Sequence, residues 1–239
     1  MERCNEVVIL CGGRGTRLFS STSHIPKSLL EVGDMPILEH IIRNYSYHGF
    51  STVKLLLGYQ GEKIRNYFKI KKLKDLNIEF IDTGLDTDTN ERIWQIRNDV
   101  SSCFALCYSD ILANVNFSEQ YLQHKKQSKI LNILTVPLRT NYGIISFNEN
   151  YIATNFQEKP TLPNYWINGG YFFVESEIFD HWNNDHIDFS RSVLPALCKQ
   201  QKASCYIHDG FWQGIDTEKD LKQLNELWAS GNAPWVMWK

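Results

Sequence analysis

Three glycines and two arginines follow a short apolar run near the start of this 239-residue sequence, and a lysine follows after a spacer. The run is Val7–Leu10, the loop is Gly12–Arg17, and Lys27 comes directly after Pro26. Glycine lets backbone N–H groups approach a phosphate and tolerates positive φ, while the cations balance polyphosphate charge. The segment therefore predicts a buried strand that leads into a nucleotide site.

The spacing of Gly12, Gly13 and Gly15 excludes two common phosphate motifs. The G-x-x-x-x-G-K-[ST] spacing of a P-loop is absent, and so is the G-x-G-x-x-G spacing of a dinucleotide fold. A glycine-rich loop of this kind is often only a tight turn. The cations Arg14, Arg17 and Lys27 favour phosphate binding over that alternative.

Two aspartates are placed to hold a divalent cation. Asp110 follows the apolar run Cys103–Tyr108, and ligands of open parallel sheets bind at the carboxyl ends of the strands. Asp216 ends the string Gly210–Asp216. Two carboxylates are what a partly hydrated Mg²⁺ usually takes from protein. The alternatives are a turn or helix-cap role for Asp110 and the N-cap of the final helix for Asp216.

Two later segments carry polar groups suited to a phosphorylated acceptor. Glu158 and Lys159 end a β segment at Pro160, which stops the strand. Asn168 offers a donor and an acceptor for a hydroxyl, and Gly170 permits close backbone approach. A charged strand end and a simple turn remain the alternatives for these two segments.

Strand-like and helix-like runs alternate along the first part of the chain, and this order predicts a parallel sheet with helices on both faces. The expected strands are Val7–Leu10, Val53–Leu57, Ile78–Ile81, Cys103–Tyr108, Leu131–Val136, Tyr171–Val174 and Ser204–His208. The expected helices are Ile37–Gly49, Gly61–Phe68, Arg92–Asn98, Phe117–Lys126, Phe189–Gln200 and Asp216–Ala229. Gly143–Asn148 and Tyr151–Gln157 are expected to pair as an added β element.

The composition narrows the class of protein. A net charge of −2 gives no basic field for nucleic acid, and no apolar stretch approaches the length of a membrane span. The six cysteines are scattered without a C-x-x-C pair, and a strand starts almost at once. We therefore expect a reduced, cytoplasmic protein without a signal peptide. No repeat or linker divides the chain, so a single domain is expected over 1–239.

The string G-G-x-G-T-R-L followed by P-K resembles the signature of the sugar-phosphate nucleotidylyltransferases, and the other motifs follow in that family's order over nearly the whole chain. Strings such as Asp82–Gly84 and the tail Leu227–Trp235 resemble its cytidylyltransferase branch. The resemblance implies an α/β, Rossmann-like, three-layer fold with a mostly parallel sheet, of the nucleotide-diphospho-sugar transferase type. It implies a nucleotide-binding half at about 1–136 and an acceptor-binding half at about 137–239.

The resemblance also implies a reaction and a set of site residues. An acceptor phosphate oxygen attacks the α-phosphorus of a nucleoside triphosphate, and pyrophosphate leaves without a protein nucleophile. CTP and α-D-glucose 1-phosphate are the leading substrates, with Mg²⁺ held by Asp110 and Asp216. By the same resemblance, the catalytic cations are Arg17 and Lys27. The implied nucleotide contacts are Leu10, Gly12, Gly13, Gly15, Thr16, Arg17, Lys27 and Ser109, and the implied acceptor contacts are Glu158, Lys159, Asn168 and Gly170.

The sequence departs from the cytidylyltransferase pattern at three places. Thr-x-Thr-Gly-Gly-Arg becomes Thr87–Arg92, with Asn90 and Glu91 in place of the glycines, which leaves the base preference open. Gly-Arg-Phe-Gly becomes Thr140–Gly143, which removes a cation, and Phe189–Pro195 has lost glutamates. A different base, another phosphorylated acceptor, or a nucleotide-binding module without turnover are the alternatives.

The tail is rich in tryptophan, with Trp228, Trp235 and Trp238. These rings could form a contact in a homo-oligomer, as exposed aromatic residues often do, or pack within the chain.

Overall fold

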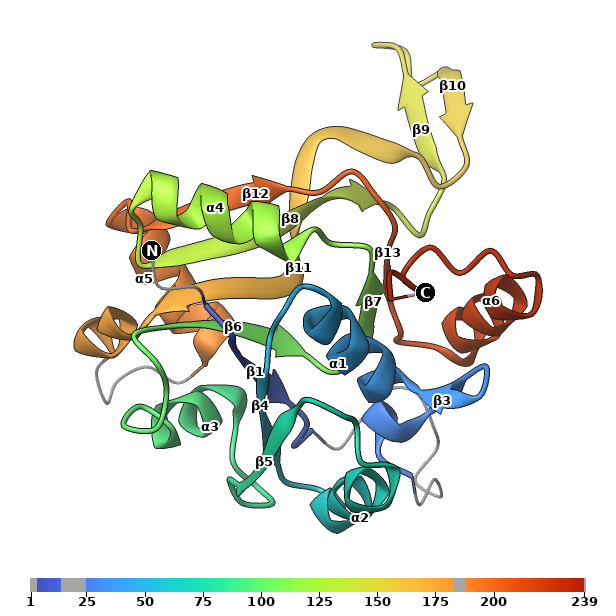
Figure 1. Ribbon diagram of the computed structural model, residues 1–239. Helices are drawn as coiled ribbons and strands as arrows, with labels where there is room; N and C mark the ends of the chain where they lie inside the picture. Colours follow the sequence, from blue (N-terminus) through green and yellow to red (C-terminus); the bar gives the residue numbers. More distant parts are fainter. Residues whose placement is uncertain (1–3, 14–24, 183–187, 239) are drawn as a thin grey trace.

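A seven-stranded sheet forms the centre of the molecule (Figure 1). The computed structural model describes residues 4–13, 25–182 and 188–238. Gly15, Thr16 and Arg17 of the predicted phosphate loop lie outside these ranges. The strand order is β12 (Ala203–Ile207), β8 (Leu131–Arg139), β11 (Thr161–Glu175), β6 (Cys103–Tyr108), β1 (Glu6–Leu10), β4 (Thr52–Leu57) and β5 (Asn77–Asp82).

The sheet is mostly parallel, as predicted. The β1, β4, β5 and β6 strands run parallel to one another, and β12 runs parallel to β8. Only β11 among these seven strands is antiparallel, and it pairs with both β6 and β8. The β11 strand begins at Thr161, well before the predicted Tyr171. The side chains of its first part are mostly exposed, so the sequence there has no buried apolar run that would predict a strand.

Both faces of the sheet are covered, and the alternation of side chains along β1 separates the two cores. Val7 and Ile9 join the core beneath α1 (Ile37–Tyr47), α2 (Gly61–Lys71) and α4 (Phe117–Gln127). Val8 and Leu10 join the core beneath α3 (Thr89–Gln95) and α5 (Leu194–Lys199). The predicted three-layer α/β architecture is therefore confirmed. No helix in the described ranges is long and apolar enough to cross a membrane.

Two helix boundaries differ from the sequence prediction for local reasons. The α3 helix begins earlier than predicted, because the Asp88 side chain accepts a hydrogen bond from the backbone N–H of Glu91 at 2.8 Å. The predicted helix Phe189–Gln200 is a π-helical turn, Phe189–Val193, followed by α5. Pro195 lacks a backbone N–H, so the helix has to restart around it.

Small β elements lie around the central sheet. The predicted added element is a hairpin of β9 (Ile144–Phe147) and β10 (Ala153–Gln157), which projects away from the sheet with every residue exposed (Figure 1). Two other pairs were not predicted. They are β2 (Glu31–Val32) with β3 (Met35–Pro36), and β7 (Ile111–Ala113) with β13 (Trp212–Gly214).

The aromatic tail packs within the chain. Trp235 is fully buried, and its indole Nε1 donates a hydrogen bond to Nδ1 of His40 at 3.2 Å. Trp228 lies edge-on to the same imidazole, and a Cβ on Gly33 would be 2.2 Å from its indole. The tail after α6 (Glu218–Ala229) therefore closes onto α1, and a homo-oligomer stays a prediction that the tail no longer supports.

The contacts of His40 predict a loss of stability in mild acid. Its Nε2 donates to the carbonyl of Val32 at 2.9 Å, so Nδ1 must stay unprotonated to accept from Trp235. Burial lowers the pKa of His40, so the unfolded chain binds a proton that the folded chain resists. The free energy of unfolding should therefore fall as the pH drops below about 6.5, the unfolded value. The free energy of unfolding, measured with urea between pH 5 and 8, should depend less on pH in His40→Gln than in wild type. His181→Gln is the control and should keep the wild-type pH dependence. The same pH dependence in all three proteins would contradict this prediction.

Candidate active site

The carboxyl ends of β1 and β6 form the base of the site. The two strands are parallel neighbours in which Leu10 pairs with Tyr108. The hydroxyl of Ser109 donates to the carbonyl oxygen of Leu10 at 2.8 Å, just beyond that pair. The glycine loop after β1 and the acidic turn after β6 therefore leave the sheet side by side, at the edge where ligands of such sheets bind.

Lys27, Asp110 and Asp216 converge at this edge, although 189 residues separate the first from the last. The Lys27 ammonium lies 2.7 Å from Oδ2 of Asp110 and 3.2 Å from Oδ1 of Asp216. Lys27 begins the short helical turn Lys27–Leu29, and its side chain is mostly buried. The predicted grouping of these three residues is thus present in the structure.

The unpredicted β7–β13 pair brings the two aspartates together. Ile111 pairs with Gly214, and the backbone N–H of Ile215 donates to the carbonyl of Asp110 at 3.0 Å. Asp216 is not the N-cap of α6. That position belongs to Thr217, which forms a capping box with Asp220. The carboxylate of Asp216 is therefore available to the site.

A cleft of about 640 Å³ opens above these groups. Seven residues proposed from the sequence line it: Leu10, Gly12, Gly13, Lys27, Ser109, Asp110 and Asp216. Further lining residues include Thr87, Asp88, Thr89, Arg92, Tyr108, Asp188 and Ser190. Most of these side chains are polar, which suits a charged ligand.

Arg92 is a residue of this cleft that the proposed site did not include. It is almost fully buried, and its guanidinium donates to the carbonyls of Leu57, Gly84 and Gly12 at 3.1, 2.8 and 3.2 Å. It also donates to the hydroxyl of Thr83 at 2.5 Å. Burial lowers the pKa of Arg92, and nearby carboxylates oppose that effect. Through its hydrogen bond to the Gly12 carbonyl, the guanidinium stabilises the turn at Gly12.

The two residues that replace glycines in the Thr87–Arg92 string are oriented differently. Glu91 is exposed and is not among the described residues that line the cleft. Asn90 is buried in the first turn of α3. The carboxylate of Glu91 therefore lies outside the cleft lining, although its charge still acts on Arg92.

Gly12 and Gly13 have different steric surroundings, which gives a matched pair of variants. A Cβ on Gly12 would lie 2.4 Å from the Arg92 guanidinium, whereas a Cβ on Gly13 would meet no heavy atom within 4 Å. We expect Gly12→Ala to destabilise the fold by about 1–3 kcal/mol by displacing the guanidinium. Gly13→Ala should keep its stability and raise KM for the nucleotide. Urea unfolding and initial rates check this; equal stabilities of the two variants would contradict it.

A second cleft, of about 920 Å³, adjoins the first, because Asp216 lines both. Lys159 lines it together with two cations that were not proposed, Arg139 and Lys219, and its contact with an acceptor phosphate stays a prediction. Arg139 supplies a positive charge one residue before Thr140–Gly143, the segment that lost a cation relative to the family pattern. Glu158 lies beside Lys159, with 3.7 Å between its Oε1 and the Lys159 Nζ.

Asn168 and Gly170 are placed differently from Lys159. The Asn168 Oδ1 accepts a hydrogen bond from the backbone N–H of Gly170 at 2.8 Å. Gly170 is buried with φ +76°, and a Cβ there would lie 2.3 Å from Ile111 Cδ1. Neither is among the described residues that line the two clefts. The glycine is required by the local backbone, and a role of either residue in acceptor binding stays a prediction.

The fold and these two clefts define an α/β protein with adjoining polar sites at the carboxyl edge of its parallel strands, and comparisons with known proteins give its class. A sequence model described as Nucleotidyl transferase matches residues 6–230. The chain is 34% identical to a probable glucose-1-phosphate cytidylyltransferase of Bacillus subtilis, over 98% of this chain and all of the relative. It is 30% identical to the glucose-1-phosphate cytidylyltransferase of Salmonella typhimurium over the same shares.

Two solved structures share the fold. HddC from Yersinia pseudotuberculosis superposes with a TM-score of 0.73 at 20% identity, covering 94% of this chain and 99% of that one. A putative glucose-1-phosphate thymidylyltransferase from Bacillus anthracis gives 0.73 at 16% identity, covering 93% and 94%. The chain belongs to the nucleotidyl transferase family, and within it to the sugar-phosphate nucleotidylyltransferases.

Proposed function

We propose that the protein transfers a cytidylyl group from CTP to α-D-glucose 1-phosphate and releases pyrophosphate. The observation that carries the proposal is the pair of clefts that meet at Asp216, one lined by the glycine turn and Lys27 and the other by Lys159. CTP and glucose 1-phosphate are the substrates that the names of the two cytidylyltransferase relatives indicate.

The proposed chemistry is an in-line displacement that needs no protein nucleophile. A phosphate oxygen of the acceptor forms a bond to the α-phosphorus, and the bond from that phosphorus to the bridging oxygen of the β-phosphate breaks. Positioning and charge neutralisation then account for most of the rate enhancement. Lys27 neutralises charge on the triphosphate, the N–H groups of Gly12 and Gly13 approach it, and Lys159 holds the acceptor phosphate.

The carboxylates fit a magnesium ion, which we propose as the cofactor. Asp110 and Asp216 already share one positive charge, the Lys27 ammonium, within hydrogen-bond distance of both. Oxygen ligands from two carboxylates, completed by phosphates and water, are the set that Mg²⁺ prefers. When bound, the ion would neutralise charge on the phosphate oxygens. Lys27 would then be released from the aspartates toward the triphosphate.

A substrate panel tests the proposal directly. Pyrophosphate release is measured with each of the common nucleoside triphosphates, Mg²⁺ and a set of sugar 1-phosphates. We expect the largest kcat/KM with CTP and glucose 1-phosphate. Faster release with another base or acceptor would correct the substrate and keep the reaction. The absence of release with every pair would reject the reaction and favour a binding module.

Asp216→Asn tests the metal assignment. The amide keeps the shape but loses the charge, so the Mg²⁺ concentration at half-maximal rate should rise at least about tenfold. Asp209→Asn is the matched control, because Asp209 lines the second cleft but is not paired with Lys27. An unaltered magnesium titration in Asp216→Asn would remove this residue from the metal site.

A further inference from the structure

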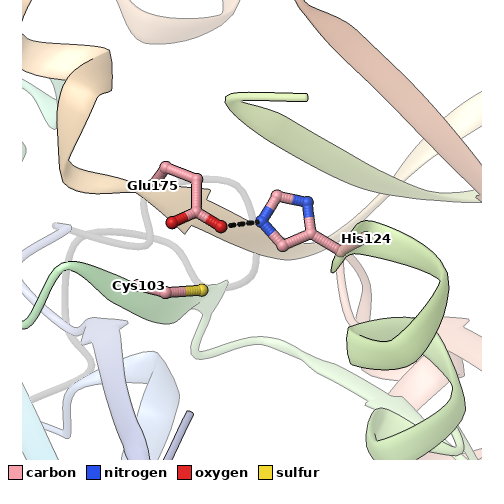
Figure 2. Close-up of side chains that lie close together, drawn as sticks. All are labelled: Cys103, His124 and Glu175. Atoms are coloured by element: carbon pink, nitrogen blue, oxygen red, sulfur yellow. Dashed lines mark hydrogen bonds and ion pairs between the residues drawn. The ribbon is translucent and has the colours of Figure 1, made fainter. Parts of the chain in front are cut away.

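A buried cluster of Cys103, His124 and Glu175 lies apart from the two clefts (Figure 2). Cys103 is the first residue of β6, whereas the nucleotide cleft opens beyond the last residue of that strand. Glu175 is the last residue of β11 and pairs with Cys103 across the antiparallel strands. The α4 helix packs over this end of the sheet and contributes His124.

The three side chains bring three different kinds of metal-ligand atom close together. A sulfur of Cys103, a ring nitrogen of His124 and a carboxylate oxygen of Glu175 all lie within 4.8 Å of one another. The His124 Nε2 is 2.9 Å from Oε1 of Glu175, and Figure 2 shows the sulfur facing this pair. Sulfur, imidazole nitrogen and carboxylate oxygen are the ligands that Zn²⁺ takes in proteins.

We propose that Cys103, His124 and Glu175 bind a divalent cation of the zinc type, at the end of the sheet opposite the nucleotide cleft. Three protein ligands leave a fourth, tetrahedral position for water. The bound ion would join β6, α4 and β11, which are far apart in the sequence. Its site is separate from the proposed Mg²⁺ site, which offers oxygen ligands only.

The cluster is accessible to solvent from one side. His124 and Glu175 line a surface cleft of about 710 Å³, together with Lys125 and Glu177. The His124 side chain is fully buried, and that of Glu175 is about one quarter exposed. An ion can therefore enter through this cleft and keep a water ligand, while the sulfur stays protected below.

Binding requires three changes of protonation or pairing. In the metal-free protein the His124 Nε2 donates to Oε1 of Glu175 at 2.9 Å, so its proton must move to Nδ1 before Nε2 can bind the cation. A coordinating cation forms a bond to sulfur, and the thiol proton passes to solvent. Lys125 donates to the same Oε1 of Glu175 at 2.8 Å and therefore competes with the ion.

The test uses the whole, tag-free protein, cleared of metal with a chelator, and Co²⁺ alone as the probe. Wild type should take up one equivalent with a thiolate-to-cobalt absorption band in the near ultraviolet. Cys103→Ser should lose the band, and Glu175→Gln should weaken Co²⁺ binding at least about tenfold. Cys198→Ser is the matched control, because it removes an exposed thiol and should leave the band intact. Circular dichroism shows that each variant is folded.

Lys125→Gln distinguishes a metal site from a cluster that has only a structural role. Removal of the competing ammonium should tighten Co²⁺ binding severalfold, while Asp216→Asn should leave the band unchanged. Zn²⁺ should also raise Tm in wild type and not in Cys103→Ser. Wild type without a thiolate band, or a band that persists in Cys103→Ser, would overturn the proposal. Neither outcome bears on the nucleotidyl transfer itself, which the pyrophosphate assay measures.

Discussion

Lys27→Ala should lower kcat by on the order of 10²-fold, which corresponds to about 3 kcal/mol of lost transition-state stabilisation. The ammonium is the cation that the described part of the chain places between Asp110 and Asp216, at the edge of the cleft. Without it, charge that develops on the phosphates is less well neutralised. The rate of pyrophosphate release at saturating substrates measures the effect.

The same variant should remain folded. The Asp216 side chain is about two thirds exposed, so solvent screens the charge that Lys27 would leave behind. Lys222→Ala is the matched control, since that lysine is exposed on α6; it should retain full activity. A Lys27→Ala protein with normal turnover and a normal melting curve would remove Lys27 from the proposed machinery.

Arg92→Met should reduce the free energy of unfolding by about 3 kcal/mol, because it removes the hydrogen bonds that a buried guanidinium donates to Thr83 and to three backbone carbonyls. The carbonyls of Leu57, Gly84 and Gly12 all lose a hydrogen bond to the guanidinium. KM for the nucleotide should rise as well, since the turn at Gly12 loses its support. Urea unfolding and initial-rate kinetics measure the two effects.

Two further variants distinguish the Arg92 guanidinium from bulk and charge. Arg92→Lys should rescue little, because one ammonium cannot reproduce a planar fork of donors. Arg97→Met is the control, since Arg97 follows α3 and its guanidinium makes an exposed hydrogen bond to the carbonyl of Trp94 and lies over the ring of that residue. Arg92→Met with wild-type stability would show that the remaining donors satisfy these carbonyls and that Arg92 is dispensable for the fold.

The sequence predicted the parallel strands well, because each is a short, buried apolar run. Cys103–Tyr108 was predicted to the residue, and β1 and β4 to within one residue at the start. The residue types and spacing after β1 also indicated a ligand site, and Gly12, Gly13 and Lys27 do line the first cleft, whereas nucleotide binding by them stays a prediction. These sequence signals are local, because they do not depend on contacts with distant parts of the chain.

Elements that depend on distant partners could not be predicted in this way. The β7 and β13 strands have three residues each and are stable only as a pair, yet about a hundred residues separate them. The burial of Arg92 beneath Gly12 likewise depends on a contact across 80 residues. The cap of α6 was a local signal that was missed: Thr217 followed three residues later by Asp220 resembles a capping box.

The contact between Trp235 and His40 has a consequence for how the chain folds during synthesis. His40, which accepts the hydrogen bond from the Trp235 indole, leaves the ribosome 195 residues before that tryptophan. Before Trp235 is synthesised, the other strands and helices can assemble, but the side of α1 that carries His40 is not yet covered by the tail. Apolar surface left exposed in a nascent chain favours aggregation, so synthesis of the tail should protect this side of α1.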